Sequence, residues 1–433
     1  MLALLIVIAV LGLYMAWNIG ANDVANSMAC AVGSKSMSVK WALITAGFCE
    51  FAGSVLVGSH VTDTIRKGIV SPDAVAAAPG VAPADAAVLM ILGMSAALLA
   101  SALWLNFATW MGMPVSTTHS IVGAVAGFGV TVAGWGAVNW WKLVQIVASW
   151  FISPVIGGIL GFCFFMAISR LILGRVRPCR DAVKYAPYTV VFVVFVVALS
   201  IVYKGLVHIS AKLSWLTGGN AFILAGALAV GAGVLSRILI GRTLRGREDL
   251  PLPQQLQLVE RIFIPVVVFC SCTVAFSHGA NDVANAIGPL AAVVDIARTG
   301  AVKMDVAVPL WVLILGGFGI VLGLATYGYR VIDTVGTKIT MLTPSRAVAA
   351  GIATTTTVLG CTKLGLPVST THTLVGAVLG IGLARGMGAV NREVTKSIFS
   401  SWLITVPAAA ILCVLLFLLS RIFLFDLIRQ ALP

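Results

Sequence analysis

The sequence predicts an all-α integral membrane protein with about twelve membrane-spanning segments, arranged as two inverted-topology repeats that contain broken or re-entrant helices. Three observations lead to this prediction. The chain has a large excess of apolar residues, two motifs each occur twice in the same order, and two clusters of basic residues flank a central insert.

The amino-acid composition is that of a protein whose surface faces lipid. Of the 433 residues, 60% are hydrophobic and only 10% are charged, whereas a soluble domain carries about 25% charged residues. A spanning helix needs roughly 20 mostly apolar residues, and several runs qualify. They are Leu2–Ile19, Leu143–Ile172, Tyr188–Tyr203, Ala221–Ile240, Val308–Leu324 and Trp402–Phe423. No basic segment precedes the first run, so we interpret it as a retained span rather than a cleaved signal peptide.

The basic residues indicate how the chain is oriented. We assign the net charge of +13 to cytoplasmic loops rather than to nucleic-acid binding, because Lys and Arg in such loops orient membrane proteins. Two basic clusters, Arg170–Lys184 and Arg237–Arg261, flank two apolar runs. Two crossings return the chain to the same side, so both clusters can be cytoplasmic. With about five spans on either side of the insert, both termini are expected outside the cell.

Two motifs occur twice along the chain. Gly20-Ala-Asn-Asp-Val-Ala-Asn26 recurs unchanged as Gly279-Ala-Asn-Asp-Val-Ala-Asn285. Pro114-Val-Ser-Thr-Thr-His119 recurs unchanged as Pro367-Val-Ser-Thr-Thr-His372. Two such matches in the same order indicate an internal duplication.

The duplication divides the chain into three parts. We expect an N-terminal repeat (1–170), a central two-span insert with basic cytoplasmic flanks (171–261) and a C-terminal repeat (262–433). The first spans of the two repeats are about seven apart in our count, and this odd number places the repeats in opposite orientations. Inverted repeats suit a transporter, because the site between them can open to either side of the membrane.

The first motif predicts a cation site. A carboxylate at membrane depth costs about 2.5–3.5 kcal/mol on insertion scales, so a partner for the motif's aspartate is expected. Carboxylate and amide oxygens are hard ligands that suit Na⁺ or a proton path. Gly20 and Gly279 are expected to let the helix unwind and free backbone carbonyls. Alternatively, these polar groups only bond to neighbouring helices. The candidate residues are Asn22, Asp23, Asn26, Asn281, Asp282 and Asn285.

The second motif predicts a helix that begins within the membrane. Pro114 and Pro367 favour a break before a first helical turn, and hydroxyl side chains can cap the unpaired N–H groups of that turn. A helix N-terminus attracts anions, and hydroxyl donors suit a tetrahedral oxyanion. A simple N-cap without a ligand is the alternative. The candidate anion-binding residues are Ser116, Thr117, Thr118, Ser369, Thr370 and Thr371.

Three further polar residues lie in or beside apolar runs. Glu50 is an isolated carboxylate without a clear counterpart in the second half, and an intramembrane carboxylate is a functional candidate by default. His119 and His372 are distant in sequence from other His or Cys residues. We expect them to form local hydrogen bonds rather than to bind a metal.

The paired motifs resemble those of the PiT family of inorganic phosphate transporters, and the resemblance covers nearly the whole chain. It implies about twelve spans in inverted repeats, Na⁺- or H⁺-coupled phosphate symport and a homodimer. It also implies that the Asn and Asp residues bind the cation, with Na⁺ at Asp23 and Asp282 if the coupling ion is sodium, and that the Ser and Thr residues bind phosphate. Glu50 matches a glutamate important in family members. Many relatives have a second glutamate where this chain has Gly351.

We therefore expect a transporter that imports inorganic phosphate by alternating access across the cell membrane, with the bacterial inner membrane as its location. An anion beside aspartates needs cations to neutralise them, which would couple the two ligands. No cofactor is expected besides the coupling ion. Alternatives are a permease for sulfate, a channel, and an intramembrane hydrolase using Ser116 or Ser369 with the nearby His. The chain lacks Gly-x-Ser-x-Gly and P-loop signatures, which argues against an enzyme.

Overall fold

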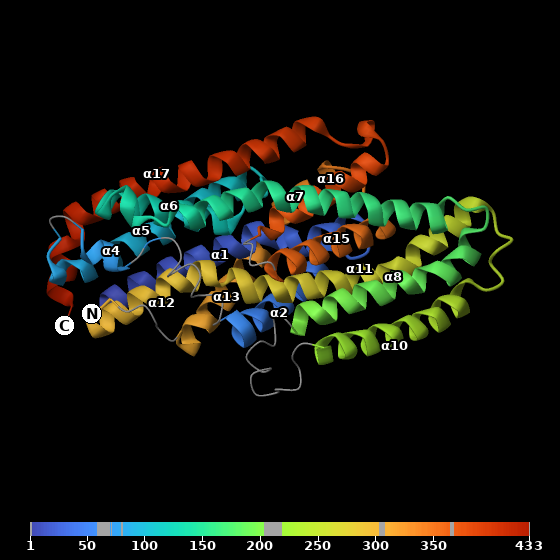
Figure 1. Cartoon of the computed structure of the whole chain (residues 1–433), viewed down its shortest axis with the longest axis horizontal. Coiled ribbons are helices and arrows are strands. Elements are labelled where there is room, and N and C mark those ends of the chain that lie inside the picture. Colours follow the sequence, from blue (N-terminus) through green and yellow to red (C-terminus); the bar gives the residue numbers. More distant parts are fainter. Residues whose placement is uncertain are drawn as a thin grey trace.

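The computed structural model describes residues 2–58, 70, 72–78, 81–202, 219–302, 308–363 and 368–432. Nearly all of these residues lie in helices, which run side by side in a bundle elongated along their axes (Figure 1). Within the described part of the chain, Val70 and Val138 form an isolated β-bridge. The predicted all-helical fold is confirmed.

The helices follow one another with short connections. Their bounds are α1 Leu2–Gly33, α2 Val39–Val57, α4 Pro72–Ala76, α5 Pro83–Trp110, α6 Thr117–Ala133, α7 Trp140–Ile168, α8 Pro178–Ser200, α10 Gly219–Leu244, α11 Leu252–Asp282, α12 Ala284–Thr299, α13 Leu310–Tyr327, α14 Tyr329–Asp333, α15 Pro344–Lys363, α16 Thr370–Ala384 and α17 Arg392–Ala431.

Nine helical segments of the described chain are long and apolar enough to cross a membrane. α6 and α16 are shorter apolar helices. The apolar runs predicted from the sequence all fall on helices, except that Tyr203 lies outside the described residues and Val308 precedes α13. The protein is therefore a multi-pass membrane protein, while the count of about twelve spans stays a prediction.

The insert folds as predicted, with α8 and α10 packed against each other. The α7–α8 and α10–α11 connections lie at the same end of the bundle, and both chain termini lie at the opposite end (Figure 1). Arg175, Arg177, Arg245 and Arg247 are exposed in these two connections. We refer to this end of the bundle as the basic end; by the positive-inside rule it faces the cytoplasm.

The helices of the two halves pack in exchanged pairs. α1 packs along α13 and α2 along α11, while α6 packs along α17 and α7 along α16. The motif glycines allow the first two contacts: a Cβ on Gly20 would collide with the carbonyl oxygen of Ile320, and one on Gly279 with that of Glu50. The expectation that these glycines unwind the helix is wrong, because both lie inside continuous helix. Their missing side chains instead admit a neighbouring backbone.

A helix interruption does occur in the second copy of the motif, four residues after Gly279. α11 ends at Asp282 and α12 begins at Ala284, and the N–H of Val283 between them donates to the carbonyl of Asn281. The first copy lies within α1, which is continuous through all seven residues. The same heptapeptide therefore has two backbone conformations in this protein.

Candidate functional site

Both copies of the second motif begin a helix inside the bundle, as predicted. Ser116 is the N-cap of α6 and Ser369 is the N-cap of α16, and both have extended backbone. Their hydroxyl oxygens accept hydrogen bonds from the backbone N–H groups of His119 (3.4 Å) and His372 (3.3 Å). Other N–H groups of each first turn have no intrahelical acceptor, so each start can attract an anion. Pro367 lies outside the described residues.

Asn22 holds the chain break that precedes α6. Its amide nitrogen donates to the Thr109 hydroxyl at 2.9 Å and to the Met113 carbonyl at 3.0 Å. Its amide oxygen accepts the backbone N–H of Val115 at 3.1 Å. In this conformation the Asn22 side chain therefore satisfies non-helical backbone at membrane depth, where an unpaired group costs several kcal/mol. The side chain predicted to bind a cation here positions the start of α6.

Asp23 joins the two motifs. Its Oδ2 accepts a hydrogen bond from the Thr117 hydroxyl at 2.8 Å, and its Oδ1 accepts from the Thr371 hydroxyl at 3.3 Å. Asn26 donates to the same Oδ1 at 3.1 Å. Thr117 begins α6 and Thr371 lies in the first turn of α16, so this single buried carboxylate contacts both helix starts.

The two asparagines of the first motif's last position make reciprocal contacts. Asn26 donates to the hydroxyls of Thr371 at 2.9 Å and Thr370 at 3.4 Å, both on α16. Asn285 donates to the hydroxyls of Thr117 and Thr118, each at 3.2 Å, on α6. Each half of the chain thus supplies the Asn that bonds to the hydroxyls of the other half. Asn285 also donates to Asp282 Oδ1 at 3.4 Å.

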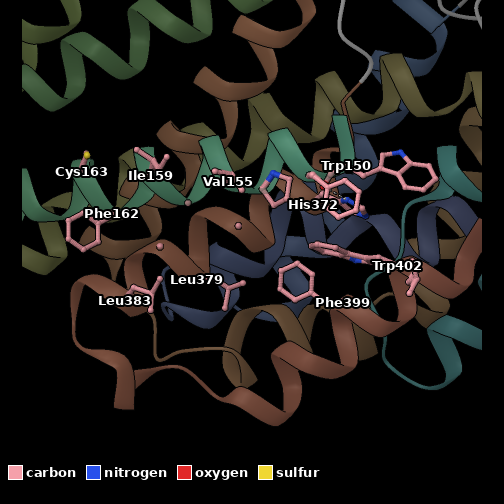
Figure 2. Close-up of a pocket in the computed structure, with 16 residues that line it drawn as sticks. Trp150, Val155, Ile159, Phe162, Cys163, His372, Leu379, Leu383, Phe399 and Trp402 are labelled. Atoms are coloured by element: carbon pink, nitrogen blue, oxygen red, sulfur yellow. Dashed lines mark hydrogen bonds between the residues drawn. The ribbon is translucent and has the colours of Figure 1, made fainter. Parts of the chain in front are cut away.

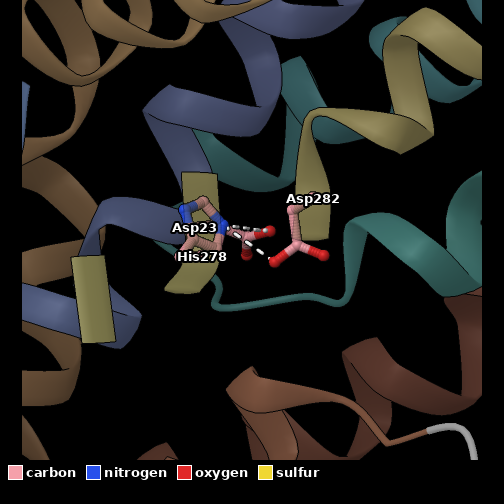
Figure 3. A group of neighbouring side chains, drawn as sticks. All are labelled: Asp23, His278 and Asp282. Atoms are coloured by element: carbon pink, nitrogen blue, oxygen red, sulfur yellow. Dashed lines mark ion pairs between the residues drawn. The ribbon is translucent and has the colours of Figure 1, made fainter. Parts of the chain in front are cut away.

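His278 lies at the centre of three carboxylates (Figure 3). Its Nε2 is 3.4 Å from Asp23 Oδ2 and 3.1 Å from Asp282 Oδ2, and its Nδ1 is 3.2 Å from Glu50 Oε2. All four side chains are buried. If all three carboxylates are ionised, a protonated His278 balances only one of the three negative charges. The cluster therefore attracts further cations in a setting where water screens little.

Asp23, His278 and Asp282 could together hold a metal ion. Each offers one ligand atom, and these atoms lie within 4.8 Å of one another. Carboxylate oxygens suit Na⁺, whereas an imidazole nitrogen favours transition metals. With the contacts shown in Figure 3, His278 itself occupies the space between the carboxylates. The two Asp residues are therefore the better Na⁺ ligands.

The rings of His119 and His372 contact tryptophans and each other. His119 lies over Trp150 with ring centroids 4.0 Å apart, His372 stacks on Trp402 at 3.6 Å, and the two imidazoles are 4.7 Å apart. Trp402 also donates its ring N–H to the Pro114 carbonyl at 2.9 Å. The expected local bonding is found for the backbone N–H groups, whereas the rings form an aromatic column behind the two helix starts.

Two small cavities adjoin the site. One of about 30 Å³ is lined by His278, Asn281 and Thr370, which leaves room for about two water molecules and none for a tetrahedral oxyanion. The other, of about 10 Å³, lies beside Asn26 and Gly351. The Cβ position of Gly351 faces Cys270, so the position without the family's glutamate lies against α11.

His278 is the site residue that the sequence interpretation missed. It directly precedes the second copy of the first motif, where the first copy has Ile19. Attention to residues that occur in both copies left it aside. A signal was available, because an ionisable residue within an apolar span is a functional candidate by default.

Comparisons with known proteins agree with one another. A model of the phosphate transporter family matches residues 19–413. The chain is 45% identical, over 415 residues, to a protein of Thermococcus kodakarensis described as a phosphate permease, and the match covers 95% of this chain and 97% of that protein. It is 40% identical over 432 residues to the chloroplastic inorganic phosphate transporter 2-1 of Arabidopsis thaliana, covering 93% of this chain and 70% of the relative. A solved structure described as the sodium-dependent phosphate transporter superimposes with a TM-score of 0.82 at 40% identity, covering 97% of this chain and all of that one.

Proposed function

The chain belongs to the phosphate transporter family, and we propose that it imports inorganic phosphate across the cell membrane by cation-coupled symport. The observation that carries this proposal is the reciprocal bonding of Asn26 to Thr371 and of Asn285 to Thr117. Each bond joins a residue assigned to the cation to a residue assigned to the anion. Occupation of one site therefore changes the position of groups in the other, as coupling requires.

Phosphate would bind between the starts of α6 and α16. The N-terminal turns of the two helices supply N–H donors and positive dipole ends, and the hydroxyls of Thr117, Thr118, Thr370 and Thr371 supply further donors. Asp23 lies within hydrogen-bond distance of both helix starts. A protonated phosphate can donate a hydrogen bond to such a carboxylate and sulfate cannot. This difference supports phosphate over sulfate as the substrate.

We assign Na⁺ as the coupling ion, with Asp23 and Asp282 as its carboxylate ligands. The excess of negative charge around His278 supports the need for cations, because a bound anion would otherwise face like charges. The solved relative is described as sodium-dependent. On this proposal Glu50, which touches His278 and accepts a bond from Ser27 at 3.4 Å, positions the imidazole between the two aspartates.

Uptake of labelled phosphate into proteoliposomes tests this function. We expect accumulation driven by an inward Na⁺ gradient, little accumulation with a proton gradient alone, and weak competition by excess sulfate. Empty liposomes provide the background. Uptake that ignores every cation gradient would contradict symport, and uptake driven equally well by protons without Na⁺ would contradict the ion assignment. Accumulation of sulfate but not phosphate would contradict the substrate. The homodimer stays a prediction, which mass measurement of the purified protein tests.

A further inference from the structure

A large apolar groove lies on the membrane-facing side of the bundle, away from the carboxylates. It has a volume of about 670 Å³ and runs between α7, α16 and α17 (Figure 2). Its walls are aliphatic and aromatic, and its inner end is closed by the rings of Trp150, His372 and Trp402. Ile159 on α7 and Leu383 on α16 line it and are more than half exposed. In a membrane such a surface is covered by hydrocarbon.

The length of the groove matches one leaflet of a bilayer. Between His372 at its inner end and Leu383 near its outer end, α16 rises by about 16 Å, which is half of a hydrocarbon core of about 30 Å. α16 begins inside the bundle and ends toward the basic end. The groove therefore extends from mid-membrane to the membrane surface at the basic end.

Basic residues continue two of the groove-lining faces to that surface. On α17, Lys396 and Arg392 precede the lining residue Phe399 by three and seven residues, which places them on the same helix face. On α7, Arg170 follows the lining residue Cys163 by seven residues in the same way. All three basic side chains are exposed. Glu393 is an exposed acidic neighbour, so the positive charge dominates without being unopposed.

A fourth basic residue lies at the end of the third wall. Arg385 is the C-cap of α16, two residues beyond the lining residue Leu383, and it is half-buried. Its guanidinium donates to the Thr340 hydroxyl at 3.0 Å and to the Met341 carbonyl at 3.3 Å. These bonds fix a positive charge beside the groove mouth.

We propose that this groove is a binding site for an anionic phospholipid of the basic-end leaflet. One acyl chain fills the groove, and the phosphate diester of the head group contacts the basic residues at the mouth. Each Lys or Arg near the surface contributes about 1 kcal/mol toward an anionic lipid, so charge selects among lipids that share the same chains. The bound chain packs along α16, the helix that begins with Thr370 and Thr371, and so supports one side of the anion site.

Native mass spectrometry of the full-length protein tests this site, with phosphatidylglycerol and phosphatidylcholine of identical chains supplied together. We expect wild type to retain phosphatidylglycerol in preference to phosphatidylcholine. Arg392→Gln combined with Lys396→Gln should weaken phosphatidylglycerol retention by roughly 30-fold. The matched control is Arg237→Gln with Arg242→Gln, which removes two exposed basic residues from α10, the helix that leads into the α10–α11 connection at the same membrane surface. This control should leave retention unchanged.

A second variant tests the chain-binding part of the groove. Ile159→Trp should fill the groove and reduce retention of both lipids, while Leu239→Trp on lipid-exposed α10 should not. Equal retention of the two lipids by wild type would overturn the proposal, as would a mouth variant that behaves like its control. If Ile159→Trp instead converts a dimer to a monomer and leaves lipid retention unchanged, the groove is an interface between two copies of the chain and the proposal fails.

Discussion

The two copies of Gly-Ala-Asn-Asp-Val-Ala-Asn are identical in sequence and differ in structure. The first lies in the unbroken helix α1, whereas the second contains the interruption at Val283 between α11 and α12. In both copies the last Asn bonds to the threonines of the opposite half. The duplication thus accounts for the hydrogen-bond geometry that the copies share, while each backbone follows its own surroundings.

The larger difference lies in residues just outside the motif. His278 precedes the second copy and Ile19 the first. The glycine of the second copy packs on Glu50, and that of the first copy packs on Ile320. Two apolar residues on one side therefore correspond to an imidazole and a carboxylate on the other. This comparison teaches that the charge of the site comes from residues present once, although its geometry comes from residues present twice.

The largest expected effect concerns the aspartates that the copies share. Asp23→Asn and Asp282→Asn each remove a buried negative charge, and each should lower Na⁺-driven phosphate uptake by roughly 100-fold or more. Asp426→Asn on the exposed end of α17 is the control and should transport normally. Normal uptake by either motif variant, at equal expression, would show that the two copies are not both required.

The next effect concerns the asymmetry itself. His278→Ile gives the second copy the residue of the first and leaves three carboxylates without their shared partner, so uptake should fall by roughly tenfold or more. Ile19→Leu, a volume-conserving change in the first copy, is the control. A cycle of Glu50→Gln, His278→Gln and the double variant should show a coupling of about 1 kcal/mol or more. Strict additivity would mean that the Glu50–His278 contact has no part in transport.

A smaller and symmetric effect is expected at the motif glycines. Gly20→Ala and Gly279→Ala both force a Cβ against a neighbouring carbonyl oxygen, and overpacking of this kind costs about 1–3 kcal/mol. Both variants should lower the thermal unfolding midpoint. Gly231→Ala on α10 meets no atom within 4 Å and should leave the midpoint unchanged or raise it. Unchanged midpoints in both motif variants would mean that the helices can separate there without loss.

The smallest effect is expected at the helix caps. Ser116→Ala and Ser369→Ala each remove an N-cap, worth about 1 kcal/mol, and should weaken the apparent phosphate affinity by about fivefold each. Ser236→Ala, which removes a hydroxyl bonded within α10, is the control. An unchanged affinity in the double variant would count against phosphate binding at the helix starts.

Much of the fold and part of the site could be predicted from the sequence, for identifiable reasons. The helix starts at Ser116 and Ser369 depend on local chemistry, in which a Pro and a run of hydroxyl residues follow one another. The insert followed from charge and apolar length alone. Such signals lie within a few residues of the feature that they predict.

The features that failed depend on distant neighbours. The role of Gly20 is set by Ile320, about half the chain away, and a glycine in an apolar helix serves unwinding and close packing equally well. Asn22 spends its side chain on the break before α6, which no spacing within its own motif indicates. His278 acquires three carboxylate neighbours only when α1, α2 and α11 come together.

The exchanged pairing of helices has a consequence for how this protein could be divided. α1 with α13, α2 with α11, α6 with α17 and α7 with α16 each join one helix from either repeat. A fragment that ends after α7 would lose a long packing partner from each of these four pairs and would expose its motif glycines. Two fragments produced together could restore every pair. The repeats descend from one unit, yet neither is now a folding unit in its own right, and the moving parts of the transporter must each contain helices from both.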